Sequence, residues 1–190
     1  KKDYASIKKV AVIYQFVVSI GAVSLVMISP ELVVFMGGEK YADSIVVVFP
    51  VVLAMYYLYV YYFPASIEYY YKKTNYIAVG TMIAAVVNIL LNWFFIPKYG
   101  YVAAAYTTVF CYFICYIFHA LLSKKVHGSP IYDMKMQIGM IIAVTCIICV
   151  GLFFKGNVFA RCGILVLELI AVIVFVINQK ELVRAMINRL

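Results

Sequence analysis

The sequence predicts an all-α, polytopic membrane protein with six transmembrane helices. Of its 190 residues, 67% are hydrophobic and only 13% are charged, and the apolar residues fall into six long runs. Soluble domains have roughly 45–50% apolar residues. Each run has close to the ~20 residues that an α-helix needs to cross a hydrocarbon core of ~30 Å. The runs are Val10–Ile28, Ile45–Ile67, Tyr76–Ile96, Tyr101–Leu122, Met136–Phe154 and Val158–Ile177.

The basic residues between these runs predict how the helices are oriented. Alternate loops place twelve of the 16 Lys and Arg residues on one side of the membrane, and the other side has only Lys40, Lys98, Lys155 and Arg161. Cytoplasmic loops carry an excess of Lys and Arg, so we expect both termini to be cytoplasmic. In these loops the net charge of +8 attracts anionic headgroups of membrane lipids. It therefore does not indicate a nucleic-acid partner.

The first run is expected to end at Ser29, Pro30 and Glu31. A hydroxyl, a proline and an acid in this order are typical of the start of a new helix. The apolar segment that follows, Leu32–Met36, is too short to cross the membrane. We therefore expect it to lie in the outer interface.

The second run is rich in tyrosine and contains Pro50 and Pro64, which should bend it. At about 100° per residue in a helix, the tyrosines point in all directions. This arrangement favours an aromatic belt at the interface over stacking on sugar rings. Tyr56 and Tyr59 lie deepest and are the best candidates for contact with a ligand.

The third run carries Asn88 and Asn92 one helical turn apart, and Thr81 continues the same face. Interhelical hydrogen bonds of such side chains contribute about 0.6–2 kcal/mol each. We expect these three residues to hold the helix against a neighbour and not to touch substrate. The turn that follows is too short for anything but a tight antiparallel hairpin. It consists of Pro97, Lys98, Tyr99 and Gly100.

Glu168 is the one acid expected near the middle of a run. An ionised carboxylate there costs several kcal/mol unless it is paired or hydrated, and membrane acids often bind a proton or a cation. Glu168 is therefore a candidate for contact with substrate or a coupling ion. The alternative is a hydrogen bond to a hydroxyl of the fifth run, such as Thr145. Arg161, on the same face, is expected to extend to the outer interface.

No catalytic, metal or cofactor site is predicted. The five cysteines lie within the runs without a nearby His or carboxylate, which is typical of packing residues. His119 and His127 are in no motif with an acid or a nucleophile. The sequence therefore does not indicate an enzyme.

Two segments resemble a known family. Asn88–Asn92, Ile96–Gly100 and Ala103–Thr108 (NILLN, IPKYG and AAAYTT) are together similar to the C-terminal portion of bacterial polysaccharide flippases. These flippases belong to the multidrug/oligosaccharidyl-lipid/polysaccharide exporter superfamily. Pro30–Ala42 is similar to an outer loop of that family. The resemblance covers about Ile7 to Lys125, and Val102 departs from it, because the family often has a second glycine near this position.

The resemblance implies a part of a two-lobed, MATE-like transporter in the bacterial cytoplasmic membrane. Residues 1–125 would be a four-helix part of its C-terminal lobe, 126–178 a terminal helix pair, and 179–190 a cytoplasmic basic tail with a short amphipathic helix. The chain begins with Lys1 and without a methionine, so we expect its partner to be a missing N-terminal portion of the same protein. The transporter would flip an oligosaccharide linked to undecaprenyl diphosphate by alternating access, with a coupling cation as a further ligand.

Two other functions stay open. A cation-coupled multidrug antiporter of the same superfamily would share the fold, so the fold alone cannot separate the two. The Ile96–Gly100 turn favours the polysaccharide branch. A small six-helix channel or a scaffold is the third hypothesis, and the sequence has no loop resembling a selectivity filter to favour it.

Overall fold

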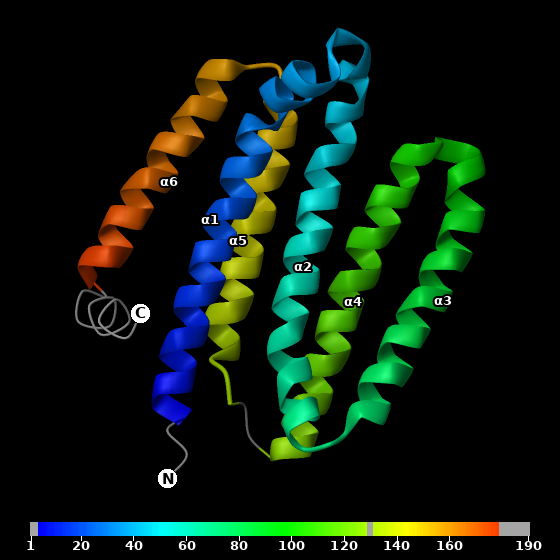
Figure 1. Ribbon diagram of the computed structural model, residues 1–190, viewed down its shortest axis with the longest axis vertical. Coiled ribbons are helices and arrows are strands. Elements are labelled where there is room, and N and C mark those ends of the chain that lie inside the picture. Colours follow the sequence, from blue (N-terminus) through cyan, green and yellow to red (C-terminus); the bar gives the residue numbers. More distant parts are fainter. Residues whose placement is uncertain (1–3, 129–130, 179–190) are drawn as a thin grey trace.

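The computed structural model describes residues 4–128 and 131–178, which form six long α-helices and no strand (Figure 1). All six are long and apolar enough to cross a membrane, which confirms the predicted all-α, polytopic fold. The basic tail expected at 179–190 lies outside the described residues. The elements are α1 (Tyr4–Gly37), the 3₁₀ helix η1 (Glu39–Ser44), α2 (Ile45–Tyr70), α3 (Thr74–Tyr99), α4 (Tyr101–His127), α5 (Met134–Phe153) and α6 (Val158–Asn178).

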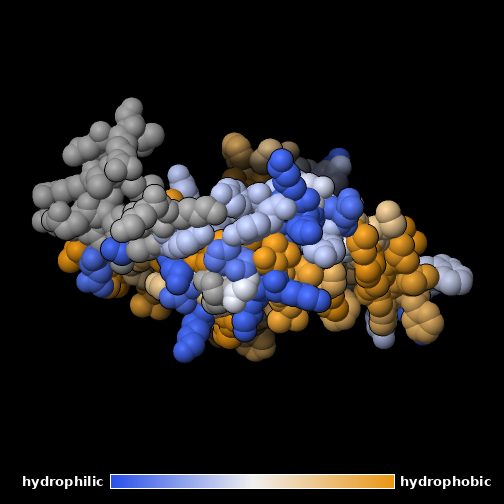
Figure 2. Space-filling model, turned by 90° about the horizontal axis from the view of Figure 1, so that it is seen from below, coloured by the Kyte–Doolittle hydropathy of each residue, from blue (hydrophilic) through white to orange (hydrophobic). Residues whose placement is uncertain are grey.

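The helices run alternately up and down, with α2 at the centre of the bundle. It packs against α1, α4 and α5, whereas α3 packs mainly on α4 and α6 lies at the edge beside α1 (Figure 1). Three lysine pairs lie at the end of the bundle where α1 begins, namely those at 8–9, 72–73 and 124–125. Seen from this end, hydrophilic residues gather on the end face and hydrophobic surface shows around its margins (Figure 2). We call this the lysine-rich end.

The prediction that the first helix ends at Ser29 is wrong, because α1 continues through Pro30 to Gly37. A proline within a helix leaves the carbonyl four residues earlier without its N–H donor. Here that carbonyl belongs to Val26, and the Ser29 hydroxyl donates to it at 2.8 Å. The side chain thus replaces the lost backbone bond, as Ser and Thr commonly do in membrane helices.

The tight hairpin predicted between the third and fourth helices is present. Its turn is shorter than expected, because Pro97, Lys98 and Tyr99 still belong to α3 and only Gly100 separates α3 from α4. Gly100 has a φ of 68°, a left-handed conformation that favours glycine. One residue therefore reverses the chain.

Buried side chains are concentrated in α2, while the helices at the edges contribute few. Among the described residues of α3 only Ile77 and Gly80 are buried, and in α6 only Arg161 is. Many of the other apolar side chains of these two helices are exposed, as expected of surfaces that face lipid or another part of a membrane protein. The polar groups described next therefore lie mostly around α2.

Candidate functional site

A cluster of uncharged polar side chains joins α1, α2 and α5 inside the bundle. Gln15 is completely buried, and its amide donates to the Tyr56 hydroxyl at 3.2 Å and to the backbone oxygen of Gln137 at 3.2 Å. The Ser19 hydroxyl donates to the Gln15 backbone oxygen at 2.7 Å and lies 3.0 Å from the Tyr56 hydroxyl. Because the Ser19 hydroxyl proton already bonds to the Gln15 backbone oxygen, the Tyr56 hydroxyl donates to the Ser19 oxygen. The cluster ties three helices together by neutral hydrogen bonds.

The two tyrosines predicted to contact a ligand occupy different environments. Tyr56 is only 2% exposed and is held by Gln15 and Ser19, so its ring is packed inside the bundle in this conformation. Tyr59 is half-buried, and its ring packs edge-on against Phe63 at 5.5 Å between centroids. A sugar ring could reach Tyr59 more readily than Tyr56.

Glu168 is bonded to a hydroxyl, but not to the one predicted. The Ser24 hydroxyl of α1 donates to Glu168 Oε2 at 2.9 Å, and Oε1 is buried without a partner among the described residues. The predicted partner, Thr145, donates to the Ile141 backbone oxygen at 2.6 Å and lies 2.8 Å from the Tyr57 hydroxyl. The prediction of Thr145 is wrong because α6 lies against α1 more than against α5.

A cavity of about 420 Å³ adjoins Glu168 where α6 diverges from α1 and α5. Its walls are apolar apart from the Glu168 carboxyl and the Ser19 hydroxyl. The other lining side chains include Phe16, Val23 and Leu167. A lipid chain or a small amphiphile fits such a lining better than a glycan does.

Arg161 lies in the first turn of α6 and anchors this helix to α1. Its side chain is 4% exposed, and its guanidinium donates to the Met27 backbone oxygen and to both carboxylate oxygens of Glu31. The fork of the guanidinium matches the carboxylate, which makes this pair directional. Glu31 is itself about half exposed. The pair is available because α1 continues past Pro30 and places Glu31 opposite Arg161.

The amide stripe of α3 contacts α4. The Asn92 amide donates to Asn88 Oδ1 at 2.9 Å, and the Thr107 hydroxyl of α4 donates to Asn92 Oδ1 at 2.5 Å. Thr81 donates to backbone oxygens of its own helix, Ile77 and Ala78. Asn92 thus bonds across to α4 through its side chain. Lys98, in the last turn of α3, lies with Nζ over the Phe94 ring at 4.2 Å from the centroid.

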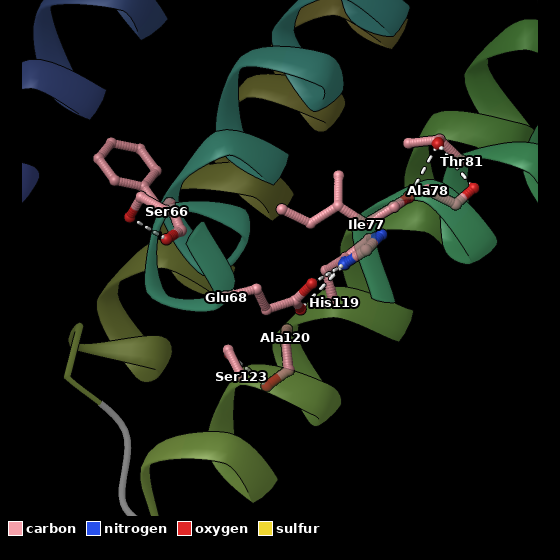
Figure 3. Close-up of polar contacts among 9 residues, drawn as sticks. Ser66, Glu68, Ile77, Ala78, Thr81, His119, Ala120 and Ser123 are labelled. Carbon is pink, nitrogen blue, oxygen red and sulfur yellow. Dashed lines mark hydrogen bonds and ion pairs between the residues drawn. The ribbon is translucent and has the colours of Figure 1, made fainter. Parts of the chain in front are cut away.

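The structure also contains a buried acid–base pair that the sequence did not predict. Glu68 of α2 and His119 of α4 are both completely buried, and His119 Nδ1 lies 2.9 Å from each carboxylate oxygen of Glu68 (Figure 3). The two residues are 51 positions apart. The predicted second run ended at Ile67 and left Glu68 outside it, so the sequence pattern did not indicate a partner for His119.

One pattern in the sequence could have revealed this pair. Glu68 lies four residues before Lys72, and His119 lies five residues before Lys124. Helices α2 and α4 both end at the lysine-rich end, so similar spacings from the lysines place the two side chains at a similar depth. A lone acid and a lone histidine at one depth in parallel helices are good candidates for pairing, because a buried charge needs a partner.

Comparison of the chain with protein-family models, with curated proteins and with solved structures gives no match.

Proposed function

We propose that this chain is the C-terminal part of a two-lobed flippase of the bacterial cytoplasmic membrane, which moves a lipid-linked oligosaccharide of the undecaprenyl-diphosphate type by alternating access. One observation carries the proposal. The two segments that resemble polysaccharide flippases occur in order on a six-helix membrane bundle, and both lie at the end opposite the lysine-rich end. The first covers the end of α1 and η1, and the second covers the α3–α4 hairpin.

The physical task is to pass a polar glycan and an anionic diphosphate through hydrocarbon. Polar groups are costly there unless they are hydrated or paired, so a water-filled path is needed. The described residues place few charges within the bundle, and the cationic groups for the diphosphate would come from the rest of the transporter. The outward apolar faces of α3 and α6 leave room for that part and for lipid. Trp93, which is 77% exposed, is on such a face.

The test uses the full-length transporter in liposomes that contain a fluorescent undecaprenyl-diphosphate oligosaccharide in both leaflets. A membrane-impermeant reductant bleaches only the outer leaflet in empty liposomes. We expect the transporter to make the inner-leaflet fraction accessible to the reductant as well. A fluorescent lipid without a glycan is the control for selectivity, and its inner-leaflet fraction should stay protected from the reductant. If the inner-leaflet fraction of the oligosaccharide also stays protected, the flippase proposal is wrong. Cation-driven efflux of drugs would then support the antiporter.

The proposed orientation has its own test, by accessibility of single cysteines in a background without the five native ones. The lysine-rich end should be cytoplasmic, because basic loops are retained there. Lys98→Cys should react with an impermeant thiol reagent in intact cells. Lys72→Cys and Lys124→Cys should react only after permeabilisation. Reaction of Lys98→Cys only after permeabilisation would reverse the orientation.

A further inference from the structure

We propose that Glu68 and His119 form a proton-binding site, in which the exchangeable proton is carried by His119 Nε2. The site lies near the lysine-rich end of α2 and α4, apart from the Tyr56 cluster and from Glu168. Its role in transport depends on the function proposed above. The binding of the proton does not, because it follows from the contacts of the pair alone.

The contacts of the imidazole decide which nitrogen exchanges the proton. His119 Nδ1 is 2.9 Å from both Oε1 and Oε2 of Glu68, which is the geometry of one N–H shared between two carboxylate oxygens (Figure 3). Nδ1 therefore keeps its proton in the pair. His119 Nε2 is buried and has no hydrogen-bond partner among the described residues. It is the one atom where the imidazole can gain or lose a proton without breaking the contact with Glu68.

The charge of the pair depends on that proton. With Nε2 protonated, an imidazolium faces a carboxylate and the net charge is zero. Without this proton, a neutral imidazole faces the carboxylate and the net charge is −1. Both side chains are 0% exposed, and an uncompensated charge in such a place is strongly destabilising. The packed arrangement of α2 and α4 therefore favours the protonated pair.

No other charged side chain of the described residues forms an ion pair with Glu68 or His119. Within the described chain, the hydrogen bonds of the Glu68 carboxylate both go to His119. The titratable neighbours are Tyr61 of α2, whose ring lies 4.9 Å from the imidazole, and Cys115 of α4, one helical turn before His119. Both are ordinarily uncharged at neutral pH. From α3, the element that closes the site, Gly80 faces the imidazole and carries no titratable group.

Gly80 shows how closely α3 covers the exchangeable position. A Cβ atom at Gly80 would lie 2.5 Å from His119 Nε2, so the backbone of α3 rests directly on this nitrogen. His119 is five residues from Lys124, which is about 7.5 Å along a helix. A small separation of α3 from α4 at the lysine-rich end would bring water to Nε2. The N–H bond would then break and the proton would pass to water, leaving the negative pair hydrated.

This arrangement links proton occupancy to conformation. The closed packing holds the proton, and the open packing stabilises its release because water can solvate the remaining charge. In a flippase that works by alternating access, such a pair would couple opening of the lysine-rich side to release of one proton. Because the proton is the ligand, no metal or further cofactor is needed.

The test is nuclear magnetic resonance of the full chain in lipid nanodiscs, with ¹⁵N-labelled histidine. The chain has only two histidines, so His127→Gln assigns the signals of His119. At neutral pH we expect both ring nitrogens of wild-type His119 to be protonated. In Glu68→Gln, which keeps the size of the side chain, His119 should instead give the pattern of a neutral imidazole. Glu168→Gln is the matched control, because it removes another membrane carboxyl and should leave His119 unchanged.

The outcomes separate this inference from the proposed function. A neutral His119 in the wild-type chain at neutral pH overturns the inference, even if Glu68→Gln does not fold. An imidazolium that persists in folded Glu68→Gln overturns it as well. The spectra require no transport, so a protonated, Glu68-dependent His119 supports the site even where the liposome assay finds no flipping. A protonated His119 together with an absence of flipping would reject the flippase proposal and leave the proton-binding site standing.

Discussion

Glu68 and Glu168 are both carboxylates within membrane-spanning helices, yet their surroundings differ. Glu68 is completely buried in the central helix α2 and faces the imidazole of His119 through both of its oxygens. Glu168 lies on the peripheral helix α6, where one oxygen accepts from the Ser24 hydroxyl and the other has no partner among the described residues. An apolar cavity adjoins Glu168, whereas α3 covers the Glu68–His119 pair.

The difference follows from the position of each helix in the bundle. Helix α2 has neighbours on several sides, so a base from α4 and a backbone from α3 can enclose its carboxylate. Helix α6 lies against little more than α1, and α1 offers only a hydroxyl at the depth of Glu168. The same residue type is thus paired with a base in one place and only hydrogen-bonded in the other. Replacing each acid should show how much the protein depends on it.

Glu68→Ala should have the largest effect on stability. It leaves the buried His119 without its partner, and removing one member of a buried ion pair costs about 3–5 kcal/mol. The free energy of unfolding, measured by denaturant titration in mixed micelles, should fall by about that amount. The double variant Glu68→Leu with His119→Phe, which removes both polar groups, should recover most of the loss. An unchanged free energy in Glu68→Ala would show that the pair does not stabilise the fold.

Arg161→Met should have an intermediate effect, because Arg161 fixes α6 to α1 at the end opposite the lysine-rich end. It removes the bonds to Glu31 and to the Met27 backbone oxygen but keeps an apolar stem of similar length. Hydrogen bonds to charged groups contribute about 1.5–3 kcal/mol to stability. Because water can hydrate the half-exposed Glu31 in the variant, we expect the free energy of unfolding to fall by an amount near the lower value.

Cross-linking of α6 to α1 provides the measurement for Arg161→Met, because the variant should let α6 separate from α1. The yield of a disulfide between Ser24→Cys and Glu168→Cys should fall relative to the same pair with Arg161 intact. Lys155→Met, which removes a nearby lysine from the α5–α6 connection, is the control and should not change the yield. An equal yield in Arg161→Met would mean that other contacts hold α6.

The sequence predicted the parts of the fold that the bilayer itself imposes. A helix must be long and apolar enough to cross hydrocarbon, so the six helices could be found from composition and length. The hairpin after Ile96 followed from its short, proline- and glycine-containing turn. These features depend on residues that are adjacent in the chain.

The contacts across helices could not be predicted in the same way. The continuation of α1 past Pro30 depends on the Ser29 hydroxyl reaching the Val26 carbonyl, which requires a particular side-chain rotamer. The partner of Glu168 depends on whether α6 lies against α1 or α5, and nothing local to α6 determines this. The first prediction failed because a side chain replaced a backbone hydrogen bond within its own helix, and the second failed because a side chain had several neighbouring helices to choose from.

Glu168→Gln should have the smallest effect, and it tests whether the second acid has a role beyond packing. Glutamine keeps an oxygen that can accept from Ser24, so the change in unfolding free energy should stay below about 1 kcal/mol. Ser24→Ala, which removes the same bond from the other side, should cost a similar amount. Larger losses in Glu168→Gln than in Ser24→Ala would mean that the carboxyl makes contacts beyond this hydroxyl.

Transport by Glu168→Gln completes the comparison of the two acids. If Glu68 and His119 carry the coupling proton, the Glu168→Gln transporter should flip oligosaccharide at the wild-type rate between about pH 5 and 8, the range in which histidine ordinarily changes charge. Glu68→Gln, measured alongside, should lose the pH dependence of the wild-type protein. The reverse result, with pH dependence lost only in well-folded Glu168→Gln, would move the coupling site to α6. The carboxyl beside the apolar cavity would then be the one that exchanges a proton or cation during transport, and the enclosed pair at α2 and α4 would be structural.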